Sequence, residues 1–208
     1  MTREKPYHHG DLRQAMLAAA EHILETEGIG ALSLRSAARS VGVSHTAPRN
    51  HFGDMTGLLS DLAAEGYRRF AASLSEVAEE AGADPQARLR AMGRAYIRFA
   101  ADHPGLFTLM FRSEQLDRAR PTLREAIAAS GAVLRDTLAA RTLPGRAVPP
   151  LVQAGRAAAV RSLVHGFAVL MLENRLNDLL ASVPGLDVYA LFEMVLNSVS
   201  LTGAEEQT

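Results

Sequence analysis

Apolar residues recur along most of the chain at helical spacing, three and four residues apart. The first such stripe is formed by Leu12, Met16, Ala19, Ala20 and Ile23. No segment shows the alternation of apolar and polar residues, rich in β-branched side chains, that is typical of strands. The pattern therefore predicts an all-α fold with no sheet.

Capping and turn residues divide this pattern into separate helices. Asp11 and Gln14 have the spacing of a capping box, Gly28 can end the first helix, and Ser33 and Ser44 can act as N-caps. The predicted helices span residues 11–27, 34–41, 45–51, 55–82, 85–102, 106–111, 121–141, 150–181 and 188–201, with a loop at 143–150.

Two of the short helices are joined by a turn at Gly42 and Val43. Leu34, Ala38 and Val41 lie on one face of the first short helix, and Val43 is the apolar residue of the turn. Two short helices joined by a turn of three or four residues containing glycine form a helix-turn-helix motif. The second helix is left with short polar residues facing outward.

Positive charge is concentrated in this motif. The chain has 22 basic and 23 acidic residues, a net charge of −1, whereas residues 33–52 hold Arg35, Arg39 and Arg49 and no acid. A recognition helix presents such side chains to base edges and phosphates. Spacing alone leaves a solvated helical hairpin as an equal alternative. The predicted DNA contacts are Ser33, Arg35, Ser44, His45, Thr46, Ala47, Arg49, Asn50 and His51.

The run from Gly30 to Ser44, followed by His51-Phe52-Gly53-Asp54, resembles the DNA-binding domain of the TetR family of transcriptional repressors. The resemblance extends from about Tyr7 to Tyr67. It implies that residues 44–51 are the recognition helix and that the protein is an all-helical homodimer. It also implies a larger C-terminal domain that binds a small molecule and then releases DNA.

Two positions of the recognition helix depart from the family pattern. Pro48 and Arg49 stand where the family usually has a Leu-Tyr pair. Arg49 replaces an aromatic residue that contacts phosphate and thymine, and arginine can instead hold a phosphate or a guanine with two hydrogen bonds. The base preference of relatives therefore does not transfer to this chain.

The resemblance predicts two domains. A helix-turn-helix domain covers residues 7–54 and continues into a linking helix to about residue 81, and a ligand-binding and dimerisation domain covers residues 83–202. Residues 96–111 and 163–167 resemble the C-terminal domain of a TetR subgroup named for a Trp-His-Gly signature. Arg161 stands at the Trp position, so no ligand role of that Trp applies here.

Soft and aromatic side chains of the C-terminal part are typical of a small-molecule cavity but also of an ordinary core. The residues predicted to line a pocket are Phe99, His103, Phe107, Met110, Phe111, His165, Phe167 and Met171. Wide apolar faces on the last two helices favour pairing with a second copy, with intrachain packing as the alternative. The predicted interface residues are Val160, Val164, Val188, Leu191, Phe192, Val195 and Val199.

Signals of enzymatic chemistry are absent from the sequence. It contains no phosphate-binding Walker loop, no dinucleotide fingerprint, no hydrolase elbow and no zinc-protease motif. The chain lacks cysteine, and adjacent His8 and His9 near Asp11 lack the preorganisation that a metal site requires. We therefore expect no catalytic residue, metal or cofactor, no membrane span, and a cytoplasmic location.

Together these observations predict a regulator that represses transcription, binds a near-palindromic DNA operator as a homodimer and is released by a small-molecule effector. One alternative is a helical small-molecule-binding protein or enzyme whose front helices do not read DNA. Another is an architectural DNA-binding protein, which the net charge of −1 disfavours.

Overall fold

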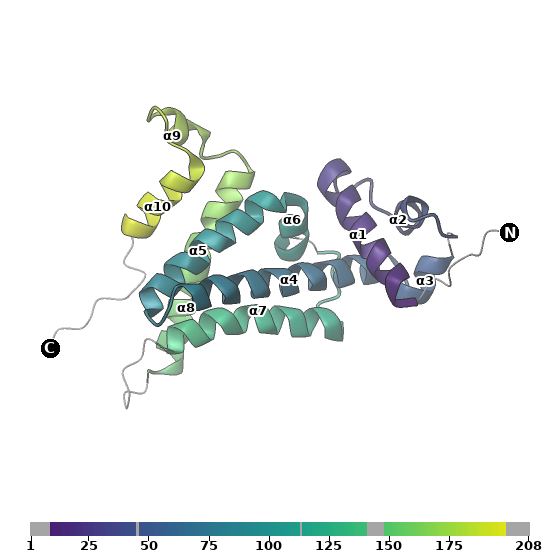
Figure 1. Cartoon of the computed structure of the whole chain (residues 1–208), viewed down its shortest axis with the longest axis horizontal. Helices are drawn as coiled ribbons and strands as arrows, with labels where there is room; N and C mark the ends of the chain where they lie inside the picture. The colour runs from purple at the N-terminus through teal and green to yellow at the C-terminus, as the bar shows by residue number, and fades with distance from the viewer. Residues whose placement is uncertain (1–8, 45, 113, 141–147, 199–208) are drawn as a thin grey trace. The chain divides into compact units, whose positions relative to one another are not determined.

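The computed structural model describes residues 9–44, 46–112, 114–140 and 148–198. Within those ranges the chain forms ten helices and no strand, which confirms the predicted all-α fold (Figure 1). The helices are α1 (His9–Glu27), α2 (Leu34–Ser40), α3 (Ala47–Phe52), α4 (Met55–Glu80), α5 (Pro85–Asp102), α6 (Pro104–Arg112), α7 (Pro121–Ala139), α8 (Pro150–Leu172), α9 (Asn177–Ala181) and α10 (Val188–Ser198).

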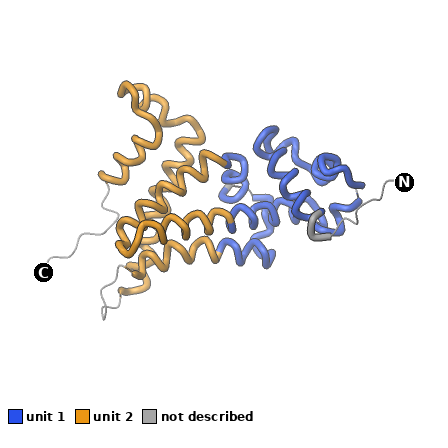
Figure 2. The backbone as a smooth tube through the Cα atoms, viewed as in Figure 1, with its two compact units in different colours: residues 1–68, 103–127 blue, residues 69–102, 128–208 orange. Residues whose placement is uncertain are grey.

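The chain divides into two compact units, which Figure 2 distinguishes by colour. Unit 1 contains residues 1–68 and 103–127, and unit 2 contains residues 69–102 and 128–208. Helices α4 and α7 therefore contribute residues to both units.

Unit 1 has an interior formed by α1, α4 and α6, in which Met16 and Phe107 are fully buried. The Tyr67 hydroxyl on α4 donates a hydrogen bond of 2.9 Å to the Met110 carbonyl oxygen on α6. A Cβ atom at Gly66 would lie 2.7 Å from the sulfur of Met110. Glycine at this position therefore allows α6 to approach α4 closely.

A buried carboxylate, Asp61 on α4, connects three segments of unit 1. Arg120 donates to its two oxygens at 2.9 and 3.0 Å, Arg13 of α1 lies 2.9 Å away, and Thr122 of α7 donates at 3.0 Å. Burial alone would raise the pKa of Asp61, but the hydrogen bonds and charges of the two arginines, with Thr122, hold that pKa below its ordinary value.

Unit 2 is held together by contacts of α5 with α8 and α10. Arg94 on α5 forms a two-pronged ion pair with Glu193 on α10, and the hydrogen bond raises the pKa of Arg94 and lowers that of Glu193. Phe192 packs its ring 4.8 Å from the ring of Phe167 on α8. A Cβ atom at Gly93 would lie 3.5 Å from Phe192, so α5 and α10 approach closely there.

Aromatic residues fill another part of unit 2. Phe70 on α4 packs against Tyr96 and Phe99 of α5, with ring centroids 5.0 and 5.1 Å apart. The Tyr96 hydroxyl and His165 Nδ1 on α8 share a hydrogen bond of 2.9 Å. A polar pair thus lies within an otherwise apolar cluster.

The predicted start of α1 and the predicted end of α8 are wrong. Helix α1 begins at His9, so Asp11 lies inside the helix rather than at its N-cap; no residue at 9 or 10 is a proline that would prevent helix before Asp11. The helix predicted over 150–181 is two helices, α8 and α9. Asn174 has φ +56°, and the amides of Asn174 and Arg175 bond back to the Met171 and Leu170 carbonyls in a helix-ending motif.

Candidate nucleic-acid interface

Helix α2 begins at a double cap formed by two serines. The Ser33 hydroxyl accepts from the Ser36 amide at 2.9 Å, and the Ser36 hydroxyl accepts from the Ser33 amide at 2.8 Å. This reciprocal pair is a capping box, and it confirms the N-cap predicted at Ser33. Two amides at the start of a short helix are thereby satisfied.

The turn after α2 is a helix-ending motif built on glycine. Gly42 has φ +72°, its amide bonds to the Arg39 carbonyl at 3.2 Å, and the Val43 amide bonds to the Ala38 carbonyl at 3.1 Å. This pair of bonds defines a Schellman motif, which requires a residue at positive φ. The predicted helix-turn-helix connection is thus present, with Ala37 and Ala38 buried on α2.

Helix α3 begins later than predicted. It starts at Ala47 with Thr46 as N-cap, rather than directly after Ser44, whose hydroxyl instead lies 3.1 Å from that of Thr46. The reason is Pro48, which has no backbone N–H. With Ser44 as the N-cap, Pro48 would be the fourth helical residue, whose N–H normally donates to a carbonyl within the helix. At the second position of α3, Pro48 costs no hydrogen bond, because amides in the first turn have no partner within the helix. The Pro48 ring is buried.

The polar residues expected to contact DNA lie on the surface of this motif. Exposed residues are Ser33, Arg35, Ser44, Thr46, Arg49 and Asn50, while Ala47 and His51 are half-buried. His45, also predicted, lies outside the described residues. Arg39 is exposed as well, and no acidic residue occurs between Gly28 and Gly53. The result is a small cationic surface with hydrogen-bonding groups.

Helix α3 is anchored by its last residue. Phe52 is 3% exposed, and the Arg13 guanidinium lies 5.7 Å from the centre of its ring. A Cβ atom at Gly57 on α4 would lie 1.9 Å from the Phe52 carbonyl oxygen. The Gly57 amide also donates to Asp54 Oδ1 at 2.8 Å, which caps α4. The junction between α3 and α4 therefore depends on a residue without a side chain.

The family described as "Tetracyclin repressor-like, C-terminal domain" matches residues 89–199, more than half of the chain. The chain belongs to the TetR family of transcriptional regulators. Among solved structures, a protein of unknown function from Rhodococcus sp. RHA1 is 34% identical, with a TM-score of 0.78 over 94% of this chain and 96% of the other. No curated protein matches this TetR-family chain.

Two further structures are similar over most of their length. The candidate regulatory protein SCO4313 is 27% identical, with a TM-score of 0.70 over 95% of this chain and 98% of that one. The TetR family transcriptional regulator PfmR from Thermus thermophilus is 20% identical, with a TM-score of 0.61 over 88% and 94%. The likeness to PfmR shows a shared fold.

The residues predicted to line a pocket fall in both units of this TetR-family fold. Four lie in unit 1: His103, Phe107, Met110 and Phe111. Four lie in unit 2: Phe99, His165, Phe167 and Met171. Phe107 and Met110 are fully buried, whereas His103, Phe111, His165 and Met171 are half-buried. Sequence reasoning missed Tyr96, whose partner His165 lies 69 residues away in the chain.

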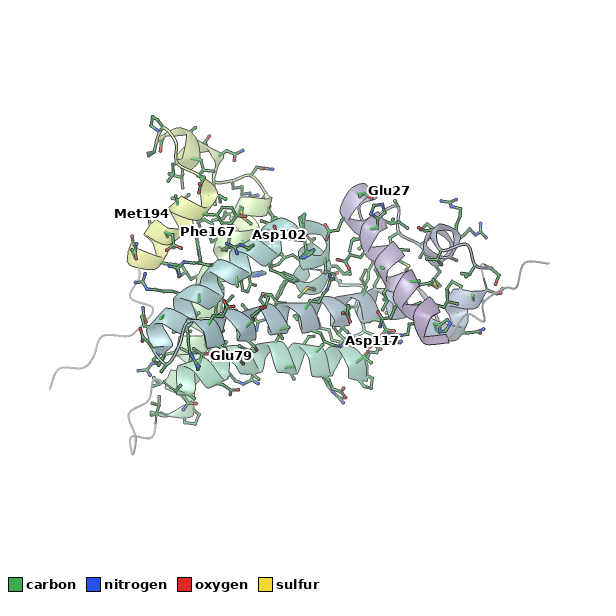
Figure 3. The ribbon with its side chains drawn as sticks, in the orientation of Figure 1. Glu27, Glu79, Asp102, Asp117, Phe167 and Met194 are labelled. Carbon is green, nitrogen blue, oxygen red and sulfur yellow. The ribbon has the colours of Figure 1, made fainter. Side chains whose placement is uncertain are left out.

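The residues predicted for a dimer interface also differ in exposure. Val160, Val164 and Phe192 are buried within unit 2, where α8 and α10 each contact α5 and the Phe192 ring packs against that of Phe167. Val188, Leu191 and Val195 are half-buried, and Val199 lies outside the described residues. Figure 3 labels Phe167 and Met194; Phe167 is 7% exposed and Met194 is 59% exposed.

Proposed function

We propose that this TetR-family regulator is a repressor that binds a near-palindromic operator as a homodimer and leaves it when a small molecule binds. The observation that carries the proposal is the acid-free surface of α2 and α3. Its three arginines, Arg35, Arg39 and Arg49, are exposed beside polar groups that suit base edges and phosphates.

In this proposal α3 lies in the major groove. Arg49 and Asn50 reach base edges, since arginine pairs with guanine and asparagine with adenine through two hydrogen bonds each. Arg35, Thr46 and Ser44 hold phosphates, with Ser33, Ala47, His45 and His51 at the edges of the contact. The Ser33 hydroxyl also caps α2, so its main effect is on the position of that helix.

The homodimer is supported by the outward face of α8. Gly155, Ala159, Ser162, Gly166 and Leu170 follow one another at helical spacing along this face. A Cβ atom at Gly155 or Gly166 would meet nothing within 4 Å. Such a stripe lets a second helix approach closely, because the distance between helix axes depends on the side chains at the contact.

Helix α8 is also, among the described residues, the one helix long and apolar enough to cross a membrane. Only 22% of its apolar window is buried in the chain. A second protein copy is the better cover for α8, because Arg156 and Arg161 lie within the helix and Arg161 is at its centre. Each arginine near the centre of a membrane span costs about 2.5–3.5 kcal/mol. A DNA-binding role places the protein in the cytoplasm.

The effector site is proposed to lie within one of the two units, among the aromatic, histidine and methionine residues already named. In unit 2 these are Phe99, His165, Phe167 and Met171. The hydrogen-bonded pair of Tyr96 and His165 offers a polar contact to a ligand in apolar surroundings. In unit 1 they are His103, Phe107, Met110 and Phe111. A ligand there acts as an effector only if it binds the DNA-free form more tightly than the DNA-bound form.

The test is a selection of fragments of the source genome by the purified full chain at near-physiological salt, followed by sequencing. We expect enrichment of a two-fold-symmetric sequence, with half-sites about 34–36 Å or a multiple of one helical turn apart. No enriched sequence from a folded dimer would contradict the proposal and favour the alternative, a small-molecule-binding protein or enzyme with a front module that does not read DNA.

A further inference from the structure

Three side chains with metal-binding groups meet in unit 1, and none of them belongs to the proposed DNA contacts. They are Glu21 and Glu25 of α1 and His103 at the start of α6. One ligand atom from each lies within 4.8 Å of the other two, and His103 Nδ1 lies 3.8 Å from Glu21 Oε1. Residues four apart share a helix face, which explains why the two glutamates point to the same place.

The Glu25 carboxylate is fixed in position by the first turn of α6. It accepts hydrogen bonds from the amides of Gly105 at 2.8 Å and Leu106 at 2.9 Å, one on each oxygen. Each carboxylate oxygen has a second lone pair, so this capping role leaves acceptor positions for another ligand. A Cβ atom at Gly105 would lie 2.9 Å from Glu25 Oε2, so glycine permits this close contact between α1 and α6.

The other two groups lie partly in solvent. The side chain of His103 is 34% exposed and that of Glu21 is 20% exposed. An ion can therefore reach the three groups from water, and water molecules can fill the remaining coordination positions. Metal–ligand bonds of about 2.0–2.2 Å place tetrahedral ligand atoms about 3.4 Å apart, which is close to the 3.8 Å between His103 and Glu21.

We propose that Glu21, Glu25 and His103 bind a divalent transition-metal ion that ties α1 to α6. Imidazole nitrogen combined with carboxylate oxygens is a donor set for Zn²⁺ and similar ions. Two carboxylates brought together on one helix face favour a divalent cation, which neutralises both charges. Spacing in the sequence does not indicate this cluster, because His103 is far along the chain from Glu21 and Glu25 and only the contact of α1 with α6 brings the three together.

A metal ion bound at this site would affect the packing of the helices of unit 1. Helix α1 contacts α2, α3 and α6. Helix α6 is in turn bonded to α4 by the hydrogen bond from the Tyr67 hydroxyl to the Met110 carbonyl. An ion shared by α1 and α6 therefore favours the arrangement of these helices that the structure has, and its binding stabilises the folded protein through linkage.

The experiment uses the full chain stripped of metal with a chelator. Zn²⁺ is added in a calorimetric titration, and Co²⁺ is added as an absorbing substitute. We expect one ion per chain, a visible Co²⁺ spectrum typical of nitrogen and oxygen ligands, and a higher Tm with Zn²⁺. His103→Ala and Glu21→Gln should each weaken Zn²⁺ binding at least tenfold, while Tm without metal stays close to that of the unchanged chain.

Two control variants separate this site from other histidines. His22→Ala removes an imidazole next to Glu21 on α1, and a His8→Ala/His9→Ala double variant removes the N-terminal pair. Both should keep full Zn²⁺ affinity. The proposal is overturned if the unchanged chain binds no Zn²⁺, if His103→Ala and Glu21→Gln bind it as tightly as the unchanged chain, or if the His8/His9 variant loses binding. None of these measurements requires DNA. A negative result would therefore reject the metal site without bearing on the proposed DNA-binding function.

Discussion

At the scale of single residues, some side chains are held by neighbours in the chain and others by partners from distant segments. The cap at Ser33 and the turn at Gly42 depend on neighbours a few residues away, so residue type and spacing are enough to predict them. The partners of Asp61, in contrast, include Arg120, which is 59 residues away. Nothing in local spacing indicates such a pair, because only the packing of α1, α4 and α7 brings the groups together.

Arg49 is the residue of α3 that we expect to distinguish bases. Arg49→Ala should weaken binding to the selected operator by about 1–3 kcal/mol and relax the preference at one position per half-site. The measurement is a titration of operator and random duplexes at one salt concentration, with Arg98→Ala on the exposed surface of α5 as the control. Equal losses on both duplexes would instead assign Arg49 to a phosphate.

Asp61 should contribute stability that depends on pH. Its pKa is lowered in the folded chain, so the contribution is complete above the unfolded pKa of about 3.9 and is lost as pH falls through the lower folded value. Asp61→Asn should lower the free energy of unfolding by about 2 kcal/mol at pH 7, because two arginines lose their charged partner.

Urea unfolding of both proteins at pH 7 and at a series of values below pH 4 measures this effect. The difference between Asp61→Asn and the unchanged chain should shrink toward the acid end. A difference that stays constant with pH would show that the charge of Asp61 does not stabilise the fold.

At the scale of helices, capping signals predicted most elements but missed interruptions. Helices α5 and α7 begin at Pro85 and Pro121 as expected, since proline suits the first helical position. Helix α3 starts later than capping signals predict because Pro48 lacks an amide, and the break after α8 is not evident from sequence because asparagine is a weaker signal of a helix end than glycine. The helical spacing of apolar residues continues past a single residue at positive φ, so this spacing does not indicate the break at Asn174.

The junction of α3 and α4 should tolerate no side chain at Gly57. An added Cβ would lie 1.9 Å from the Phe52 carbonyl oxygen, which belongs to the backbone and cannot rotate away. Gly57→Ala should lower the free energy of unfolding by about 3 kcal/mol and displace α3, with a matching loss of operator affinity.

Gly66→Ala on the same helix is the matched comparison. Its Cβ would meet the Met110 sulfur at 2.7 Å, and a flexible thioether can move aside. We expect a cost of about 1 kcal/mol in thermal or urea unfolding. Equal costs for the two variants would contradict the role assigned to the Phe52 carbonyl.

At the scale of the whole molecule, the class of fold followed from sequence but the grouping of helices did not. Helix α6 belongs to the same compact unit as α1, and this grouping depends on contacts such as that of Glu25 with Gly105 and Leu106. The division into a DNA-binding domain and a ligand-binding domain describes function, and it stays a prediction. The candidate DNA contacts could be predicted because they lie in one short motif, whereas the pocket and interface residues depend on long-range packing.

Dimerisation through α8 should be sensitive to the size of the side chain at Ala159. Ala159→Arg places a long charged group in the stripe of small residues and should convert the dimer to a monomer at micromolar concentration. Light scattering during size-exclusion chromatography measures the mass. Ala129→Arg, on the exposed surface of α7, is the control and should leave the dimer intact; a dimeric Ala159→Arg protein would place the interface elsewhere.

The central claim, that two copies of α3 read DNA, is tested most directly by chemical protection of the selected operator. The unchanged chain should protect two half-sites related by two-fold symmetry, on one side of the duplex. An Arg49→Ala/Asn50→Ala double variant, folded and dimeric, should lose that protection at the same protein concentration. Protection of a single block, or the same protection by the double variant, would contradict the claim.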